Sequence, residues 1–141
     1  MVEADGDIAQ GGSESVIALV DDDRNILTTV SIALQAEGFV TRIYTDGHSA
    51  LKSLVENPPD LAVFDIKMPK MDGLTVLKHI REDEELRRLP VIILTVSKAE
   101  EDRLNSYDLG ANAYIMKPVG FENFSGAVRT ISLFWKLVEL P

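Results

Sequence analysis

Side chains that could perform phosphoryl chemistry stand at the ends of short apolar runs of the chain. They are Asp21 and Asp22 after VIALV, Asp65 at the end of DLAVFD, Thr95 at the end of VIILT, and Lys117 at the end of NAYIMK. Aspartate can be the covalent nucleophile when a phosphoryl group is transferred. An ammonium group can pair with the nucleophile or the transferred group, and a hydroxyl can hydrogen-bond a phosphoryl oxygen. The set therefore predicts phosphoryl transfer to a carboxylate.

The run of three aspartates at 21–23 requires something to offset its charge. Like charges about 4 Å apart repel by roughly 4 kcal/mol at an effective dielectric of 20. A hard divalent cation such as Mg²⁺ binds one or two carboxylates together with phosphate oxygens and water. We therefore expect Asp22 and Asp65 to bind Mg²⁺, with Asp21 acting through a water molecule. Asp23 is expected to cap the following helix instead, because a carboxylate there satisfies free N–H groups.

The positions of these residues depend on a regular alternation of strands and helices. Apolar, β-branched runs predict strands at 16–20, 39–44, 60–65, 91–95 and 112–117. Helical periodicity and terminal signals predict helices at 24–38, 46–57, 72–83, 97–110 and 121–140. Strict alternation indicates an α/β fold, an open parallel sheet with helices on both faces. Because ligands of such sheets bind beyond the carboxyl ends of the strands, the reactive side chains are expected at one edge.

The composition is that of one acidic domain. The chain has 141 residues, enough for a single core, and a formal net charge of −9 that disfavours nucleic-acid phosphates and anionic lipids. It contains no cysteine, which excludes disulfides, thiolate catalysis and cysteine-based metal sites. No apolar run is long enough to span a bilayer, and the acidic amino terminus is unlike a secretory signal. We expect a cytoplasmic protein that binds neither nucleic acid nor membranes directly.

Four segments of the sequence, in order, resemble the receiver domain of bacterial two-component response regulators, within the CheY-like superfamily. They are LVDDD, VFDIKMPKMDG, ILT and YIMKP, each at a predicted strand end. The resemblance covers residues 16–137 and implies a flavodoxin-like (βα)5 sheet with strand order 2-1-3-4-5. Residues 1–15 carry too little apolar surface to become ordered and are expected to form a flexible tail. Residues 138–141 are expected to form a short carboxyl-terminal tail.

What the resemblance implies is a phosphorylation switch rather than an enzyme with a separate substrate. Asp65 would accept a phosphoryl group from a phosphohistidine on a sensor histidine kinase. Asp22 and the backbone carbonyl of Lys67 would bind Mg²⁺ directly, and Asp21 would complete the acidic pocket. The domain would catalyse only its own phosphorylation and dephosphorylation.

The resemblance also implies how the signal leaves the site. Thr95 and Lys117 would hold the phosphoryl oxygens, and Tyr114 stands where receivers carry an aromatic residue that turns inward on activation. Phosphorylation would then shift an existing equilibrium and change the face formed by helix four, strand five and helix five. Val96 follows Thr95 where many receivers have alanine or glycine, so narrower access and slow autodephosphorylation are expected.

The two halves of the chain look like different receivers. YTDGHSALKSL and FDIKMPKMDG are similar to receivers of winged-helix transcription regulators, whereas SKAEEDRLNSYDLGANAYIMKPVGFENF resembles stand-alone receivers that partner bacterial phytochromes. The second resemblance implies a phytochrome-type kinase as partner. No linker or winged helix follows Leu137, so we expect a single-domain regulator. Apolar residues of the last helix, including Leu133 and Trp135, favour a homodimer through the face of strand five and helix five.

Two other functions stay open beside the switch. A haloacid-dehalogenase-type phosphatase also uses a strand-end aspartate, Mg²⁺, a threonine and a lysine, and would take Asp21 as nucleophile in the pattern Asp21-x-Asp23. Against it, Arg24 and Asn25 stand where that family continues with glycine or valine and threonine. A passive flavodoxin-like binding module would leave the acidic cluster without a use, and the chain lacks an evident flavin phosphate loop.

Overall fold

The computed structural model describes residues 15–66, 68, 71–105, 109–117, 126 and 128–133. Within them, one parallel sheet contains β2 (Val16–Val20), β3 (Val40–Tyr44), β4 (Leu61–Asp65), β5 (Val91–Thr95) and β6 (Ala113–Met116). The spatial order is β3-β2-β4-β5-β6, which is 2-1-3-4-5 when the strands are counted along the chain. The predicted flavodoxin-like order is therefore confirmed.

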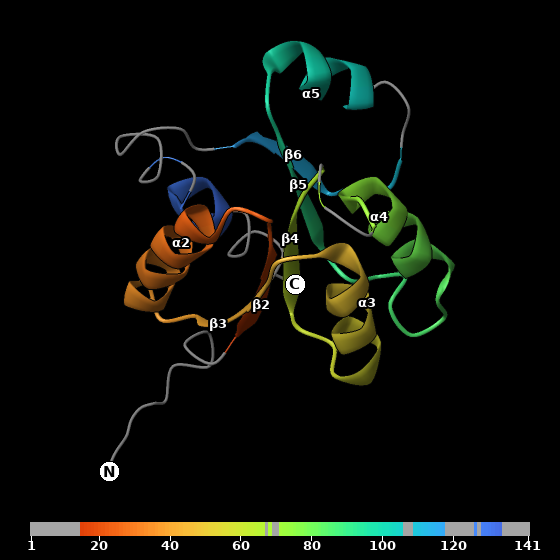
Figure 1. The fold of residues 1–141 in the computed structure, drawn as a ribbon, viewed down its shortest axis with the longest axis horizontal. Helices are drawn as coiled ribbons and strands as arrows, with labels where there is room; N and C mark the ends of the chain where they lie inside the picture. Colours follow the sequence, from red (N-terminus) through yellow and green to blue (C-terminus); the bar gives the residue numbers. More distant parts are fainter. Residues whose placement is uncertain are drawn as a thin grey trace.

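Helices cover both faces of this sheet (Figure 1). Their bounds are α2 (Arg24–Ala36), α3 (Gly47–Glu56), α4 (Gly73–Glu82) and α5 (Lys98–Asn105), and residues 126 and 128–133 are also helical. The segment 128–133 packs with α2 on one face, whereas α3 and α4 pack on the other. The α5 helix contacts β5 and β6. The prediction of helices on both faces is confirmed.

The sheet separates two apolar clusters, because successive side chains of a strand point to opposite faces. The central strands β4 and β5 are buried along their whole length. Such continuous burial is typical of parallel strands that are covered on both sides. The cluster beside α2 includes Leu19, Leu34, Val63, Leu94 and Ile131, and the cluster beside α3 and α4 includes Leu54, Phe64, Leu77, Ile80 and Ile93.

Aspartate side chains begin three of the helices that follow the strands. Asp23 accepts hydrogen bonds from the N–H groups of Asn25 at 2.9 Å and Ile26 at 3.3 Å, which confirms its predicted capping role. Asp46 and Asp72 cap α3 and α4 in the same way. These caps let each helix begin within a few residues of the strand end, so the strand-end side chains are held on short connections.

The last strand is shorter than the sequence predicts. A strand is expected at 112–117, and the structure has β6 at Ala113–Met116. Asn112 lies outside the strand because its side-chain oxygen accepts the N–H of Val91 at 2.8 Å, while its own N–H donates to the Val91 carbonyl at 2.8 Å. Lys117 follows the strand and extends its side chain into the acidic cluster.

Both predicted tails fall almost entirely outside the described residues, so their boundaries stay predictions. Ser15 is described and buried, and its carbonyl accepts the N–H of Val40 at 2.9 Å. The predicted helix at 121–140 is described at 126 and 128–133 alone. Among the described residues, no helix is long and apolar enough to cross a membrane.

Two glycines permit close backbone contacts around the segment that leads into α4. A Cβ on Gly47 would lie 1.9 Å from the carbonyl oxygen of Met71, and one on Gly73 would lie 2.3 Å from the carbonyl oxygen of Asp65. Both obstacles are backbone atoms, which cannot rotate away as a side chain can. Close packing of α3 and α4 around the end of β4 therefore requires glycine at both positions.

Gly47→Ala is expected to lower the free energy of unfolding by about 1–3 kcal/mol, because the methyl group must displace backbone. Gly126→Ala is the matched control, since a Cβ there meets nothing within 4 Å and the residue is helical. It is expected to raise stability by about 0.5–1 kcal/mol. Urea unfolding measures both variants, and equal midpoints for the two would contradict the packing argument.

Candidate functional site

The strand-end residues come together at the carboxyl edge of the sheet. Asp65 is the last residue of β4 and pairs in register with Leu94, so Thr95 at the end of β5 lies one residue further. Asp21 follows β2 directly, and Lys117 follows β6 directly. Parallel strands end at the same edge, which is why residues distant in sequence meet there. The predicted convergence is present in the fold.

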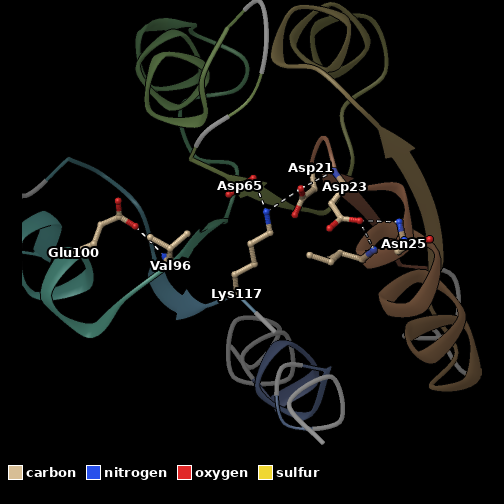
Figure 2. A network of polar contacts seen from close by, with 8 residues as sticks. Asp21, Asp23, Asn25, Asp65, Val96, Glu100 and Lys117 are labelled. Carbon is tan, nitrogen blue, oxygen red and sulfur yellow. Dashed lines mark hydrogen bonds and ion pairs between the residues drawn. The ribbon is translucent and has the colours of Figure 1, made fainter. Parts of the chain in front are cut away.

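The centre of the site is an ion-paired lysine (Figure 2). Lys117 Nζ lies 2.8 Å from Asp65 Oδ2 and 3.1 Å from Asp21 Oδ1. Asp21 is 1% exposed and Asp65 is 2% exposed, so both carboxylates are removed from bulk water. Asp21 Oδ1 also accepts the N–H of Asp23 at 2.9 Å. One ammonium group therefore offsets the charges of two buried carboxylates.

The pKa values of Asp21 and Lys117 are both raised, which favours the neutral form of the first and the charged form of the second. Burial, aided by the charge of Asp65, raises the pKa of Asp21 from 3.8 to about 6, although the Asp23 N–H and Lys117 oppose the rise. Burial alone would lower the pKa of Lys117, but its contacts with Asp65 and Asp21 outweigh that effect and the pKa lies above its ordinary value. Lys117 is thus held as a cation, while the charged form of Asp21 is costly.

The carboxylates suit a divalent cation. One oxygen each from Asp21, Asp22 and Asp65 lie within 4.8 Å of one another. Asp21 Oδ2 is buried and has no hydrogen-bond partner in the part of the chain that the structure describes. Asp22 is exposed, so the cluster opens toward solvent. An oxygen-only donor set with an unpaired buried carboxylate oxygen fits Mg²⁺ or Mn²⁺. The backbone carbonyl of Lys67, the other predicted ligand, lies outside the described residues.

The predicted switch residues have defined positions beside the cluster. Thr95 is fully buried, and its hydroxyl donates to the carbonyl of Ile115 on β6 at 3.4 Å, a long contact. Its backbone carbonyl accepts the N–H of Lys117 at 2.6 Å. Tyr114 pairs in register with Ile93 and packs against the apolar cluster beside α3 and α4. Both residues thus connect β6 to the interior, and their switching roles stay predictions.

A contact that the sequence prediction missed lies at the start of α5. Glu100 Oε1 accepts the N–H of Val96 at 2.9 Å, and the Glu100 N–H donates to Ser97 Oγ at 3.1 Å (Figure 2 shows the contact between Glu100 and Val96). The spacing Ser97-x-x-Glu100 is that of a capping box, which signals the bond to Ser97 Oγ, but Glu100 accepts the N–H of Val96, one residue before the cap, instead of that of Ser97.

Comparison with known proteins identifies what the chain resembles. A family model described as the response regulator receiver domain matches residues 17–129. Transcriptional regulatory protein RprY of Bacteroides fragilis is 36% identical over 115 residues, which make up 82% of this chain and 48% of RprY. The chain therefore spans about half the length of that relative.

Solved structures extend the similarity to the whole fold. The Mn²⁺-bound form of response regulator Rcp1 is 32% identical, with a TM-score of 0.76 over 86% of this chain and 94% of that one. The phosphorylated cyanobacterial phytochrome response regulator RcpA is 31% identical, with a TM-score of 0.79 over 90% of this chain and 97% of that one.

The raised pKa of Asp21 predicts that Asp21→Asn increases the free energy of unfolding by an amount that depends on pH. Between pH 3.8 and about 6 the folded protein keeps a proton that the unfolded chain has lost, so stability falls as pH rises through this window. Asparagine escapes this loss. With chelator present, the variant should be more stable than wild type by about 1–3 kcal/mol near pH 8 and nearly equal to it near pH 4.

Urea unfolding across this pH range measures the effect. Asp22→Asn is the control, because Asp22 belongs to the same cluster but is exposed, and it should change stability by less than about 0.5 kcal/mol. An Asp21→Asn variant that is less stable than wild type at high pH would contradict the interpretation that burial dominates.

Proposed function

Because the chain belongs to the response regulator receiver domain family, we propose that it is a phosphorylation switch in which Asp65 accepts a phosphoryl group. The observation that carries the proposal is the Lys117 ammonium group, 2.8 Å from Asp65 within a cluster of three carboxylates. Asp65 ends a central, fully buried strand, so its position is fixed by the core. A receiver domain implies a histidine kinase as partner.

The proposed step transfers a phosphoryl group from a histidine nitrogen of the kinase to a carboxylate oxygen of Asp65. The N–P bond of a phosphohistidine on the kinase breaks, and its electron pair stays on the imidazole nitrogen, which takes up a proton. A carboxylate oxygen of Asp65 forms the new O–P bond. Lys117 orients the carboxylate beforehand and balances negative charge on the transferred group. Asp21, Asp22, Asp65 and the carbonyl of Lys67 would hold Mg²⁺, which would supply further positive charge against the phosphoryl oxygens.

The phosphatase alternative, with Asp21 as nucleophile, is not favoured. That chemistry needs a proton donor two residues further on, at Asp23. Asp23 Oδ1 instead accepts the N–H groups of Asn25 and Ile26 and caps α2. These contacts support Asp65 as the acceptor.

The output surface is proposed to be the face of α5, β6 and the last helix. Thr95 and Tyr114 join the site to this face, because Thr95 bonds to β6 and Tyr114 lies within it. Val96 and Met116 expose apolar surface there, which supports a homodimer through the same face. The similarity to RcpA supports a phytochrome-type kinase as the donor. The proposal further comprises a receiver at 16–137 in a cytoplasmic regulator without direct nucleic-acid or membrane binding.

Acetyl phosphate with Mg²⁺ tests the acceptor directly. The wild-type chain should gain one phosphoryl group that is stable in acid and labile in alkali, as an acyl phosphate is. Asp65→Asn should not gain it, because an amide oxygen is too weak a nucleophile. Intact mass spectrometry measures the adduct, and removal of Mg²⁺ with a chelator should suppress it in the wild type.

Asp21→Asn is the discriminating control for this experiment. It keeps Asp65 and Lys117, so it should retain a residual, slower uptake of the phosphoryl group. Hydrolysis of a phosphate monoester that is lost in Asp21→Asn but kept in Asp65→Asn would overturn the switch and favour the phosphatase. A wild-type chain without an adduct from acetyl phosphate or a phosphorylated kinase would also overturn it.

Val96 is proposed to slow autodephosphorylation. Its side chain is 56% exposed next to Thr95, where it can obstruct the water that attacks the acyl phosphate. Val96→Ala should shorten the phosphoryl half-life by up to about tenfold, which corresponds to roughly 1.4 kcal/mol in the barrier. Val55→Ala, at an exposed valine on α3, is the control and should leave the half-life unchanged. An unchanged half-life in Val96→Ala would refute this role.

A further inference from the structure

The position of Lys117 depends on where the edge strand β6 lies along β5. At one end of β6, the N–H of Lys117 donates to the carbonyl of Thr95 at 2.6 Å. At the other end, Asn112 binds Val91 twice, with its N–H donating to the Val91 carbonyl and its Oδ1 accepting the Val91 N–H, both at 2.8 Å. The strand is short and half-exposed, and its pairing with β5 covers only Ala113 to Met116, so contacts at its two ends reinforce a short ladder.

Arg81, in the last turn of α4, holds the end of β6 that is remote from Lys117. Its Nε donates to the carbonyl of Gly110 at 2.8 Å, and its Nη2 donates to Asn112 Oδ1 at 3.1 Å. Its Nη1 donates to the carbonyls of Leu89 at 2.8 Å and Arg87 at 3.1 Å. One guanidinium group therefore joins the segment entering β5 to the segment entering β6.

These contacts use the shape of the guanidinium group rather than its charge. Within the described residues, all the acceptors of Arg81 are neutral oxygens. Burial lowers the pKa of Arg81 from its ordinary value, which is consistent with a cation that has no carboxylate beside it. Gly110 adopts a φ of +98°, and a Cβ there would lie 3.2 Å from Cγ and Nε of Arg81. A glycine at this position leaves room for the arginine to lie against the loop.

We propose that Arg81 and Asn112 are positioning residues that fix the register of β6 and thereby hold the Lys117 ammonium group between Asp65 and Asp21. Side chains alternate along a strand, so a slip of one residue would turn Lys117 to the opposite face of the sheet. Smaller displacements would lengthen the contacts of 2.8 and 3.1 Å to the carboxylates. The consequence for phosphoryl transfer rests on the proposed function, whereas the placement of Lys117 does not.

Hydrogen exchange by NMR at one fixed pH tests the placement without phosphorylation. Arg81→Met removes four hydrogen bonds and Asn112→Ala removes two, so each should speed exchange of the Lys117 backbone amide by about tenfold or more. The ammonium protons of Lys117, observable while ion pairing slows their exchange with water, should broaden or disappear. The amide of Leu19, on the inner strand β2, serves as an internal reference for global stability.

A matched arginine variant separates positioning from a general loss of stability. Arg42→Met removes a hydrogen bond of 2.8 Å from Nη1 to the carbonyl of Asn57, at the opposite edge of the sheet. This control should leave both Lys117 signals as in the wild type. Arg81→Lys keeps the charge but not the forked donors, so it should behave as Arg81→Met. Asn112→Asp keeps the acceptor oxygen and should restore the wild-type exchange rate.

The proposal is overturned if Arg81→Met and Asn112→Ala change the Lys117 signals no more than Arg42→Met does, or if Asn112→Asp fails as Asn112→Ala does. If Arg81→Met does not fold, the two Asn112 variants decide. A second measurement, uptake from acetyl phosphate with Mg²⁺, should slow in Asn112→Ala and recover in Asn112→Asp. Absence of uptake in the wild type would refute the proposed function while the exchange data still decide the placement of Lys117.

Discussion

The interaction on which the arrangement depends is a single ammonium group shared by two buried carboxylates. Asp21, Asp65 and Lys117 follow or end three different strands, and their contacts of 2.8 and 3.1 Å exist only when all three strands are in register. Two carboxylates this deeply buried would be prohibitive without a counter-charge. Even with it, burial keeps the pKa of Asp21 near 6. The charge of the lysine alone therefore does not fully compensate the two carboxylates, and a second cation would stabilise their ionised forms.

Much of the fold and the composition of the site could be predicted from the sequence. The strands and the strand-end residues follow from local periodicity and from the rule that parallel strands end at one edge, so Asp21, Asp65 and Lys117 were predictable together. The links made by Arg81 were not, because its acceptors are backbone carbonyls whose position depends on tertiary packing. Periodicity carries no information about such acceptors. The hydrogen bond from the Val96 N–H to Glu100 was partly predictable, because the Ser97-x-x-Glu100 spacing marks the start of a helix in the sequence.

The carboxyl ends and the amino ends of the strands carry different kinds of contact. At the carboxyl edge, charged groups are concentrated and one carboxylate oxygen of Asp21 lacks a hydrogen bond within the described residues. At the amino ends of β5 and β6, Arg81 donates to the carbonyl of Leu89 and Asn112 Oδ1 accepts the N–H of Val91, so backbone groups of neighbouring segments are satisfied there. Structural hydrogen bonds therefore gather at the amino ends of the strands, and the candidate reactive groups gather at the carboxyl ends. The glycine at 73 connects these demands, because only a residue without a side chain lets α4 start against the carbonyl of Asp65.

The α5 helix buries fewer residues in the core than α2, α3 and α4 do. Leu104 is its one buried residue, and most of its other residues are charged, with Lys98 lying 3.4 Å from Asp102 and 3.7 Å from Glu101. Exposed ion pairs of this kind contribute little to folding. Substitutions at its outward-facing charged residues are therefore expected to cost little stability. On the proposed output face, the chemistry of α5 can thus be changed without altering the acidic cluster or the sheet beneath it.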